Sequence, residues 1–93
     1  MIKSFKCEET EKIFNRQFSK KLPHSIQKIA IRKLWMVDAA FSINDLRIPP
    51  SNHLELLYPK TQNRYSIRVN KQWRLCFRWS NGSAFNLEII DYH

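Results

Sequence analysis

The spacing of apolar residues changes between the first and the second half of this chain, close to Leu54, and this change limits the folds that the chain can adopt. Between residues 8 and 41, apolar residues recur at three- and four-residue steps, which is the period of an amphipathic helix. Beyond it, apolar and polar residues alternate, as they do in a strand with one buried face. A run of helices followed by a run of strands favours an α+β fold with an antiparallel sheet.

Two helices are expected in the first half of the chain. Residues 8–18 place Ile13, Phe14 and Phe18 at helical spacing behind three glutamates, whose charge is favourable at a helix N-terminus. Pro23 can begin a second, longer helix, which we place at residues 23–41. Its expected apolar stripe consists of Ile26, Ile29, Ala30, Leu34, Val37 and Phe41.

Five strands are expected around these helices. Residues 2–5 alternate and form a short first strand; after an extended loop at residues 42–52, alternation returns in residues 54–58, 65–69, 73–79 and 84–92. Asn81-Gly82 suits a two-residue hairpin turn. The predicted order is β-α-α-β-β-β-β, with two helices packed on one face of a mainly antiparallel sheet. A length of 93 residues suits one domain spanning residues 1–93.

Alternation assigns each side chain of the later strands to one face of the sheet. The face toward the helices should hold Tyr65, Ile67, Val69, Trp73, Leu75, Phe77, Trp79, Phe85, Leu87 and Ile89. The opposite face should hold Arg64, Ser66, Arg68, Arg74, Cys76, Arg78, Asn86, Glu88, Ile90 and Tyr92. Guanidinium groups on neighbouring strands can hold a phosphate from several sides. The alternative is a solvated sheet face that charge keeps soluble.

The charge of the chain favours a polyanionic partner. Sixteen Lys and Arg residues against eight Asp and Glu give a net charge of +8, so nucleic acid is the leading partner class. No paired spacing of cysteine and histidine indicates a zinc site, and no metal or other cofactor is expected. The N-terminal residues lack a secretion signal and no apolar run approaches the roughly 20 residues of a membrane span. We therefore expect a cytoplasmic protein with reduced cysteines and no membrane contact.

The last residues of the chain supply groups for acid–base chemistry. Cleaving RNA without a metal ion requires a base for the 2′-hydroxyl, a cation for the phosphate and an acid for the leaving 5′-oxygen. Arg74, Tyr92 and His93 offer such groups, and a histidine exchanges protons near neutral pH. The alternative is that a histidine at the end of a chain is frayed and idle.

Several segments together resemble HigB-type toxins of the RelE superfamily. They are residues 1–5, 48–52, 54–55, 65–70, 72–79 and 88–93. The resemblance spans the whole chain and implies the RelE-like fold. It also implies a growth-inhibiting toxin of a type II toxin-antitoxin system, a ribosome-dependent and metal-independent endoribonuclease (mRNA interferase) that cleaves messenger RNA. The implied partners are the ribosome with its message and a HigA-like antitoxin, with DNA reached only through the antitoxin.

The resemblance also implies roles for individual residues. By their matching positions, Arg74, Tyr92 and His93 are expected to be catalytic. Where relatives carry a lysine after the second strand, this chain has Tyr58, and where some relatives carry a catalytic histidine three residues earlier, it has Glu55.

We expect Lys60 to restore part of the missing positive charge, or Tyr58 to donate a proton. The expected substrate-binding residues are Tyr58, Lys60, Arg64, Arg68 and Arg78.

Two other functions remain open at this point. A ParE-like toxin of the same superfamily acts on DNA gyrase without the RNA-cutting residues, and the terminal Tyr92-His93 pair argues against it. A non-catalytic nucleic-acid-binding module would use the arginines as a phosphate platform, but the chain lacks a recognition motif for one. The polar face of the second helix, with Lys28, Arg32 and Lys33, is expected to be solvated, with ribosome contact as the alternative.

Overall fold

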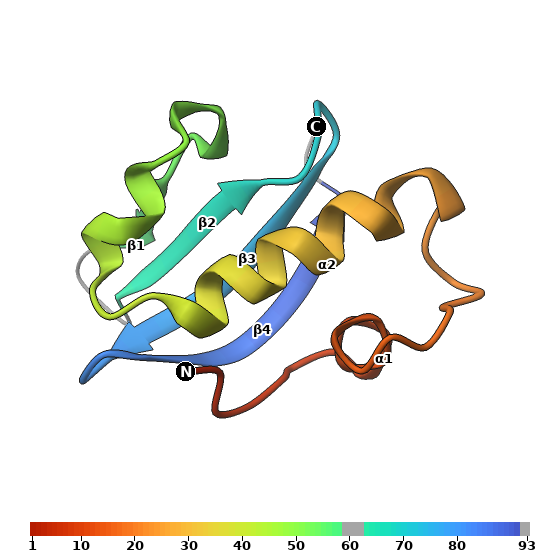
Figure 1. Cartoon of the computed structure of the whole chain (residues 1–93), viewed down its shortest axis with the longest axis horizontal. Helices are drawn as coiled ribbons and strands as arrows, with labels where there is room; N and C mark the ends of the chain where they lie inside the picture. The colour runs from red at the N-terminus through yellow and green to blue at the C-terminus, as the bar shows by residue number, and fades with distance from the viewer. Residues whose placement is uncertain (59–62, 92–93) are drawn as a thin grey trace.

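Two helices lie on one face of a four-stranded antiparallel sheet (Figure 1). The computed structural model of the chain describes residues 1–58 and 63–91. The elements are α1 (Glu8–Phe14), α2 (His24–Ala39), the 3-10 turns η1 (Ile43–Arg47) and η2 (Pro50–Asn52), and the strands β1 (Glu55–Tyr58), β2 (Arg64–Arg68), β3 (Trp73–Ser80) and β4 (Ser83–Asp91). The strands lie in the order β1-β2-β3-β4. The predicted α+β arrangement is confirmed.

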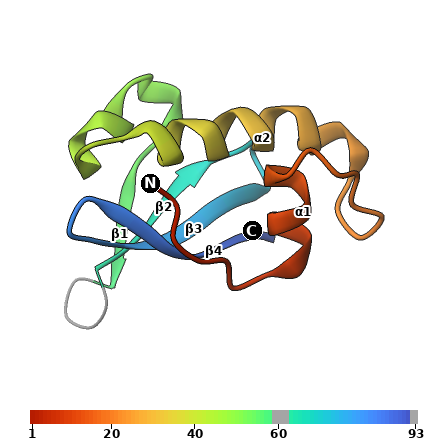
Figure 2. The same ribbon diagram turned by 60° about the horizontal axis from the view of Figure 1, so that its bottom comes forward.

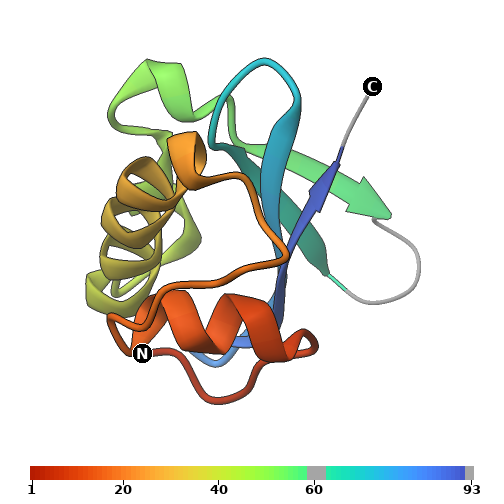
Figure 3. The ribbon, with the colours of Figure 1, turned by 90° about the vertical axis from the view of Figure 1, so that its right-hand side faces the viewer.

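The hydrophobic core fills the space between α2 and the sheet (Figure 2). The buried residues of α2 lie at helical spacing, and those of the strands alternate, because each element turns one face inward. The largest fully buried apolar side chains are Ile26, Leu34, Val37, Leu46, Ile67, Leu75, Phe77 and Leu87. Figure 3 shows both helices on one side of the sheet and its other face uncovered by any helix. We call this uncovered side the open face.

The turn between β3 and β4 has the geometry that Asn81-Gly82 predicts. Asn81 has φ 51° and Gly82 has φ 75°, so both central residues adopt the left-handed conformation that this hairpin turn requires. A side chain at position 82 would be strained in this conformation.

The predicted first strand at residues 2–5 is only partly correct. Ile2 and Phe5 form isolated parallel bridges with Ala84 and Leu87 of β4, without a continuous ladder between them. The interruption falls at Asn86, whose φ of 56° bulges β4 and whose N–H binds the Ser4 hydroxyl at 2.9 Å. The segment therefore follows β4 but cannot pair with it residue by residue.

Helix α1 ends earlier than predicted, at Phe14 instead of residue 18. Arg16 adopts a left-handed conformation with φ 63°, and the N–H groups of Arg16 and Gln17 bind the carbonyl oxygens of Ile13 and Lys12. This is a Schellman motif, which usually contains glycine at the position of Arg16. Phe18 consequently lies outside the helix with 59% of its surface exposed.

Helix α2 also ends before the predicted residue 41. The carboxylate of Asp45 accepts hydrogen bonds from the N–H groups of Phe41 and Ser42, at 2.9 and 3.1 Å, and so draws these residues into the cap of η1. Phe41 is 90% exposed, and its expected place in the apolar stripe was wrong. The loop at residues 42–52 contains two 3-10 turns. No helix in the described part of the chain is long and apolar enough to span a membrane.

Candidate active site

Strand register aligns the residues of the open face in three rows that cross the sheet. Residues that pair across adjacent strands point to the same face, and those two positions apart along a strand do too. The first row is Arg68, Arg74 and Ile90; the second is Glu55, Ser66, Cys76 and Glu88; the third is Arg64, Arg78 and Phe85. The structure therefore brings Arg64, Arg68, Arg74 and Arg78 together, as the alternation predicted.

Phe85 belongs to the open face, and its predicted place facing the helices was wrong. Cys76 pairs with Glu88 but Arg78 pairs with Phe85, so the register between β3 and β4 shifts by one residue at the Asn86 bulge. An extra residue in one strand reverses the facing of every residue beyond it. Ala84 accordingly points into the core, and the Arg78 guanidinium lies 4.6 Å from the centre of the Phe85 ring.

Arg74 lies across the sheet and does not project from it. Its Nε atom donates to Ser66 Oγ on β2 at 2.8 Å, and its Nη2 atom donates to the His53 carbonyl oxygen at 2.6 Å. Nη2 also lies 3.8 Å from Glu55 Oε1 on β1. A cation held by three segments is fixed before any substrate arrives.

The centre of the open face is buried, which argues against the alternative of a wholly solvated sheet face. Arg74 is only 7% exposed, and Ser66 and Cys76 are fully buried. Arg74 bonds to Ser66, and Arg64 pairs with Glu88, the cross-strand neighbour of Cys76. Long charged side chains can cover smaller neighbours with their apolar stems. The arginines of this face are therefore part of the folded structure.

Pairs of like charge face each other across β2 and β3. Arg64 pairs with Arg78, and Arg68 pairs with Arg74. Like charges directly opposite are destabilising in an antiparallel pair. Glu88 offsets part of this repulsion, since its carboxylate lies 3.4 Å from both Arg64 Nη2 and Lys6 Nζ. A bound polyanion would relieve the remainder, so this arrangement favours an anionic ligand.

The Cys76 thiol in the middle row is unreactive near neutral pH. Burial raises the pKa of Cys76 to about 11, with the nearby Glu88 and Glu55 acting in the same direction and Arg64 and Arg74 opposing it. A thiol with this pKa is protonated near neutral pH and is a poor nucleophile. Cys76 therefore fills space below the arginines.

Three of the predicted site residues, Lys60, Tyr92 and His93, lie outside the described residues. The last described pairs of β4 set Ile90 opposite Arg74 and Asp91 opposite Trp73. The backbone of Tyr58 pairs with that of Arg64, in the third row. The roles expected of these side chains stay predictions.

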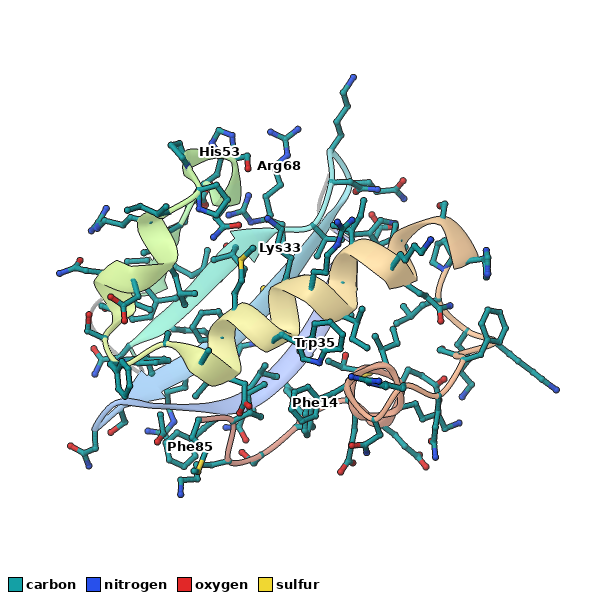
Figure 4. All side chains as sticks on the ribbon, viewed as in Figure 1. Phe14, Lys33, Trp35, His53, Arg68 and Phe85 are labelled. Carbon is teal, nitrogen blue, oxygen red and sulfur yellow. The ribbon has the colours of Figure 1, made fainter. Side chains whose placement is uncertain are left out.

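The two residues that hold Arg74, Ser66 and His53, were not identified as site residues from the sequence. The sequence pattern assigned Ser66 only to a face of the sheet and indicated no role for His53. His53 has a left-handed backbone, with φ 45°, and an exposed side chain in the same part of the molecule as Arg68 (Figure 4). Its carbonyl contact joins positions 21 apart, so no local pattern marks it. Among residues 1–58 and 63–91, no three His, Cys, Asp or Glu side chains gather as a metal site.

The helices on one face, the arginine rows on the other and the small basic chain define the class of RelE-like toxins. Residues 3–93 match the family described as RelE-like toxin of type II toxin-antitoxin system HigB. The chain therefore belongs to the HigB-like toxin family, which confirms the resemblance seen in the sequence.

Individual relatives agree with this assignment. An uncharacterized protein of Haemophilus influenzae is 54% identical over 73 residues, which cover 78% of this chain and 71% of the relative. Toxin HigB-1 of Vibrio cholerae is 49% identical over 65 residues, 70% of this chain and 68% of the relative. Endoribonuclease HigB of Proteus vulgaris is 32% identical over the full length of both chains.

Proposed function

We propose that this protein is the toxin of a type II toxin-antitoxin system and cleaves messenger RNA on the ribosome without a metal ion. The family match and the full-length similarity to a protein named Endoribonuclease HigB support the reaction class. The observation that carries the proposal within the structure is Arg74, a nearly buried cation held by Ser66 and His53 in a face of paired arginines.

Arg74 is proposed to bind the scissile phosphate. Negative charge builds on the phosphate oxygens as the 2′-oxygen attacks, and a guanidinium fixed in advance stabilises this charge without reorganising. Arg64, Arg68 and Arg78 would hold neighbouring parts of the strand through charge-assisted hydrogen bonds. Tyr58 and Lys60 are proposed to add further contacts to the RNA.

The proton transfers are assigned to Glu55 and to the last two residues of the sequence. Glu55 has a half-exposed carboxylate 3.8 Å from the Arg74 guanidinium. A scissile phosphate bound to Arg74 would therefore bring the 2′-hydroxyl of the adjoining ribose within reach of this base. His93 or Tyr92 is proposed to protonate the leaving 5′-oxygen. In this scheme Glu55 takes the position at which some HigB-type toxins carry a histidine.

The proposed partners follow from the family. A HigA-like antitoxin neutralises the toxin, and contact with DNA occurs only through this antitoxin. The ribosome and its message place the reaction in the cytoplasm.

The proposal is tested by induced expression in a bacterial host, with Arg74→Ala as the inactive control. Wild-type protein should stop growth with loss of transcripts, and co-expression of the antitoxin encoded beside it should restore growth. In vitro, cleavage should require ribosome-bound message. Growth arrest with intact transcripts and broken DNA would replace this proposal with a gyrase-directed toxin, and RNA binding without cleavage would replace it with a binding module.

A further inference from the structure

A second cationic site lies between α2 and the end of β2, at the edge of the open face. It is a pocket of about 450 Å³, lined by Ile29, Arg32, Lys33, Met36, Ser51, Arg68 and Val69. This volume is in the range of pockets that hold small molecules. Figure 4 shows Lys33 and Arg68 in the same part of the molecule. No acidic residue is among the described residues that line it.

Two of the three cations that line this pocket, Lys33 and Arg68, are held by hydrogen bonds. The Lys33 ammonium donates to Asn52 Oδ1, and the buried Asn52 side chain donates in turn to the Leu46 carbonyl oxygen at 3.1 Å. Arg68 Nε donates to the Asn70 carbonyl oxygen at 3.2 Å, which sets the direction of its guanidinium. Burial, and then the charge of Arg32, lower the pKa of Lys33. An anion in the pocket would therefore meet cations that form no ion pair with a carboxylate of residues 1–58 or 63–91.

The rest of the lining limits what kind of anion fits. Ile29, Met36 and Val69 form an apolar wall beside the three charges. A bare inorganic anion would leave this wall uncovered, whereas a nucleotide has an apolar sugar or base face next to its phosphate. We propose that the pocket binds a phosphodiester of an RNA strand, with the sugar or base of that nucleotide against the apolar wall.

The position of the pocket favours RNA over an acidic side chain of a protein partner. Arg68 is the cross-strand partner of Arg74, so the pocket and the proposed scissile-phosphate site begin at adjacent backbone positions. A polymer with regularly repeated phosphates can occupy both sites, and a single carboxylate can occupy only one. This inference rests on the proposed function for the identity of the strand, and it extends the substrate contact from the sheet to Arg32 and Lys33 of α2.

The test measures binding, so that it does not depend on cleavage. The probe is a fluorescein-labelled RNA oligonucleotide with 2′-O-methyl riboses, which cannot be cleaved, titrated with the full chain in low-salt buffer. Arg32→Gln and Lys33→Gln are compared with Lys28→Gln, which removes the same charge from an exposed position of α2 outside this pocket. Each pocket variant should weaken binding about tenfold and lower the slope of log K against log salt by about 0.7, the value for one phosphate on a single strand. Lys28→Gln should change binding less than about twofold.

Thermal unfolding of each variant shows whether it is folded, and amide chemical shifts of wild-type protein titrated with inorganic phosphate show whether a free anion suffices. Wild-type RNA binding by folded Arg32→Gln and Lys33→Gln would overturn the proposal, even if Arg74→Ala abolished cleavage as the proposed function requires. Inorganic phosphate that bound as tightly as the RNA would also overturn it, as would pocket variants that lost antitoxin binding and kept RNA binding. Normal RNA binding through the pocket without cleavage on ribosomes would instead count against the proposed function.

Discussion

Arg74 Nη2 donates a hydrogen bond of 2.6 Å to the carbonyl oxygen of His53, and this contact ties β3 to the segment that leads into β1. Together with the bond from Arg74 Nε to Ser66, it sets the plane of the guanidinium. A donor that is already fixed loses little entropy when it binds the crowded phosphate of the transition state. The same contacts make Arg74 part of the stability of the fold.

Replacing Arg74 should therefore affect both cleavage and stability. Arg74→Ala should slow single-turnover cleavage by about 10²- to 10³-fold, about 2.7–4 kcal/mol in the transition state. It should also lower the free energy of unfolding by about 1–3 kcal/mol, because Ser66 and His53 lose their donor. Arg74→Lys should recover only part of the rate, because an ammonium lacks the planar fork. Cleavage of ribosome-bound message measures the rate, and denaturant unfolding measures the stability. An unchanged cleavage rate in folded Arg74→Ala would refute the role of Arg74 at the scissile phosphate.

Deleting His93 should reduce cleavage by about 10²-fold or more, because a general acid or base contributes about this much. Antitoxin binding should be unchanged, which a pull-down with the co-expressed antitoxin checks. The cleavage rate of Tyr92→Phe shows how far the Tyr92 hydroxyl shares the proton transfer. Wild-type rates in both proteins would place the proton transfers elsewhere.

Tyr58 stands where relatives carry a lysine, and two variants, Lys60→Ala and Tyr58→Phe, test what replaces that lysine. If Lys60 supplies the missing charge, Lys60→Ala should slow cleavage about tenfold or more, and Tyr58→Phe should have little effect. If the Tyr58 hydroxyl donates a proton, the order should reverse. Single-turnover rates decide between them, with circular dichroism as the check on folding. Equal, wild-type rates would remove both residues from the site.

Cleavage should survive EDTA at a level that leaves ribosomes intact. The mechanism uses the 2′-oxygen of the substrate as nucleophile, so the products should carry a 2′,3′-cyclic phosphate or the 3′-phosphate formed from it. End-group analysis of the fragments measures this. Fragments with 3′-hydroxyl ends would contradict the mechanism.

The buried thiol predicts a loss of stability at alkaline pH. Burial raises the pKa of Cys76 from 9.0 to about 11, so between these values the folded state keeps a proton that the unfolded state releases. The free energy of unfolding should therefore fall as pH rises through this window, by up to about 2–3 kcal/mol at 1.36 kcal/mol per pKa unit. Cys76→Ala should lack this part of the loss, although its stability at pH 7 is lower because of the small cavity.

Denaturant unfolding of both proteins at pH 7, 9 and 10.5 makes the comparison, because the two proteins differ only at position 76. An identical alkaline decline in the two proteins would show that the thiol does not contribute.

The sequence determined the features that depend on local periodicity. Alternation placed Arg64, Arg68, Arg74 and Arg78 on one face, and Asn81-Gly82 marked the hairpin. The change of period near Leu54 predicted helices first and an antiparallel sheet after them. Each of these follows from the repeat of side-chain direction within one element, which needs no information from the rest of the chain.

Only the tertiary structure decided which of those side chains are buried and where each element ends. The Asn86 bulge, which follows from pairing with β3 and the N-terminal segment, turned Phe85 to the open face. Helix α1 ends at Phe14, before a left-handed Arg16 at a position that is usually glycine. Arg74 became a fixed, buried cation through contacts to Ser66 and His53, which are 8 and 21 positions away. Periodicity fixes the direction of a side chain relative to its own strand, but its partners are set by the packing of segments distant in sequence.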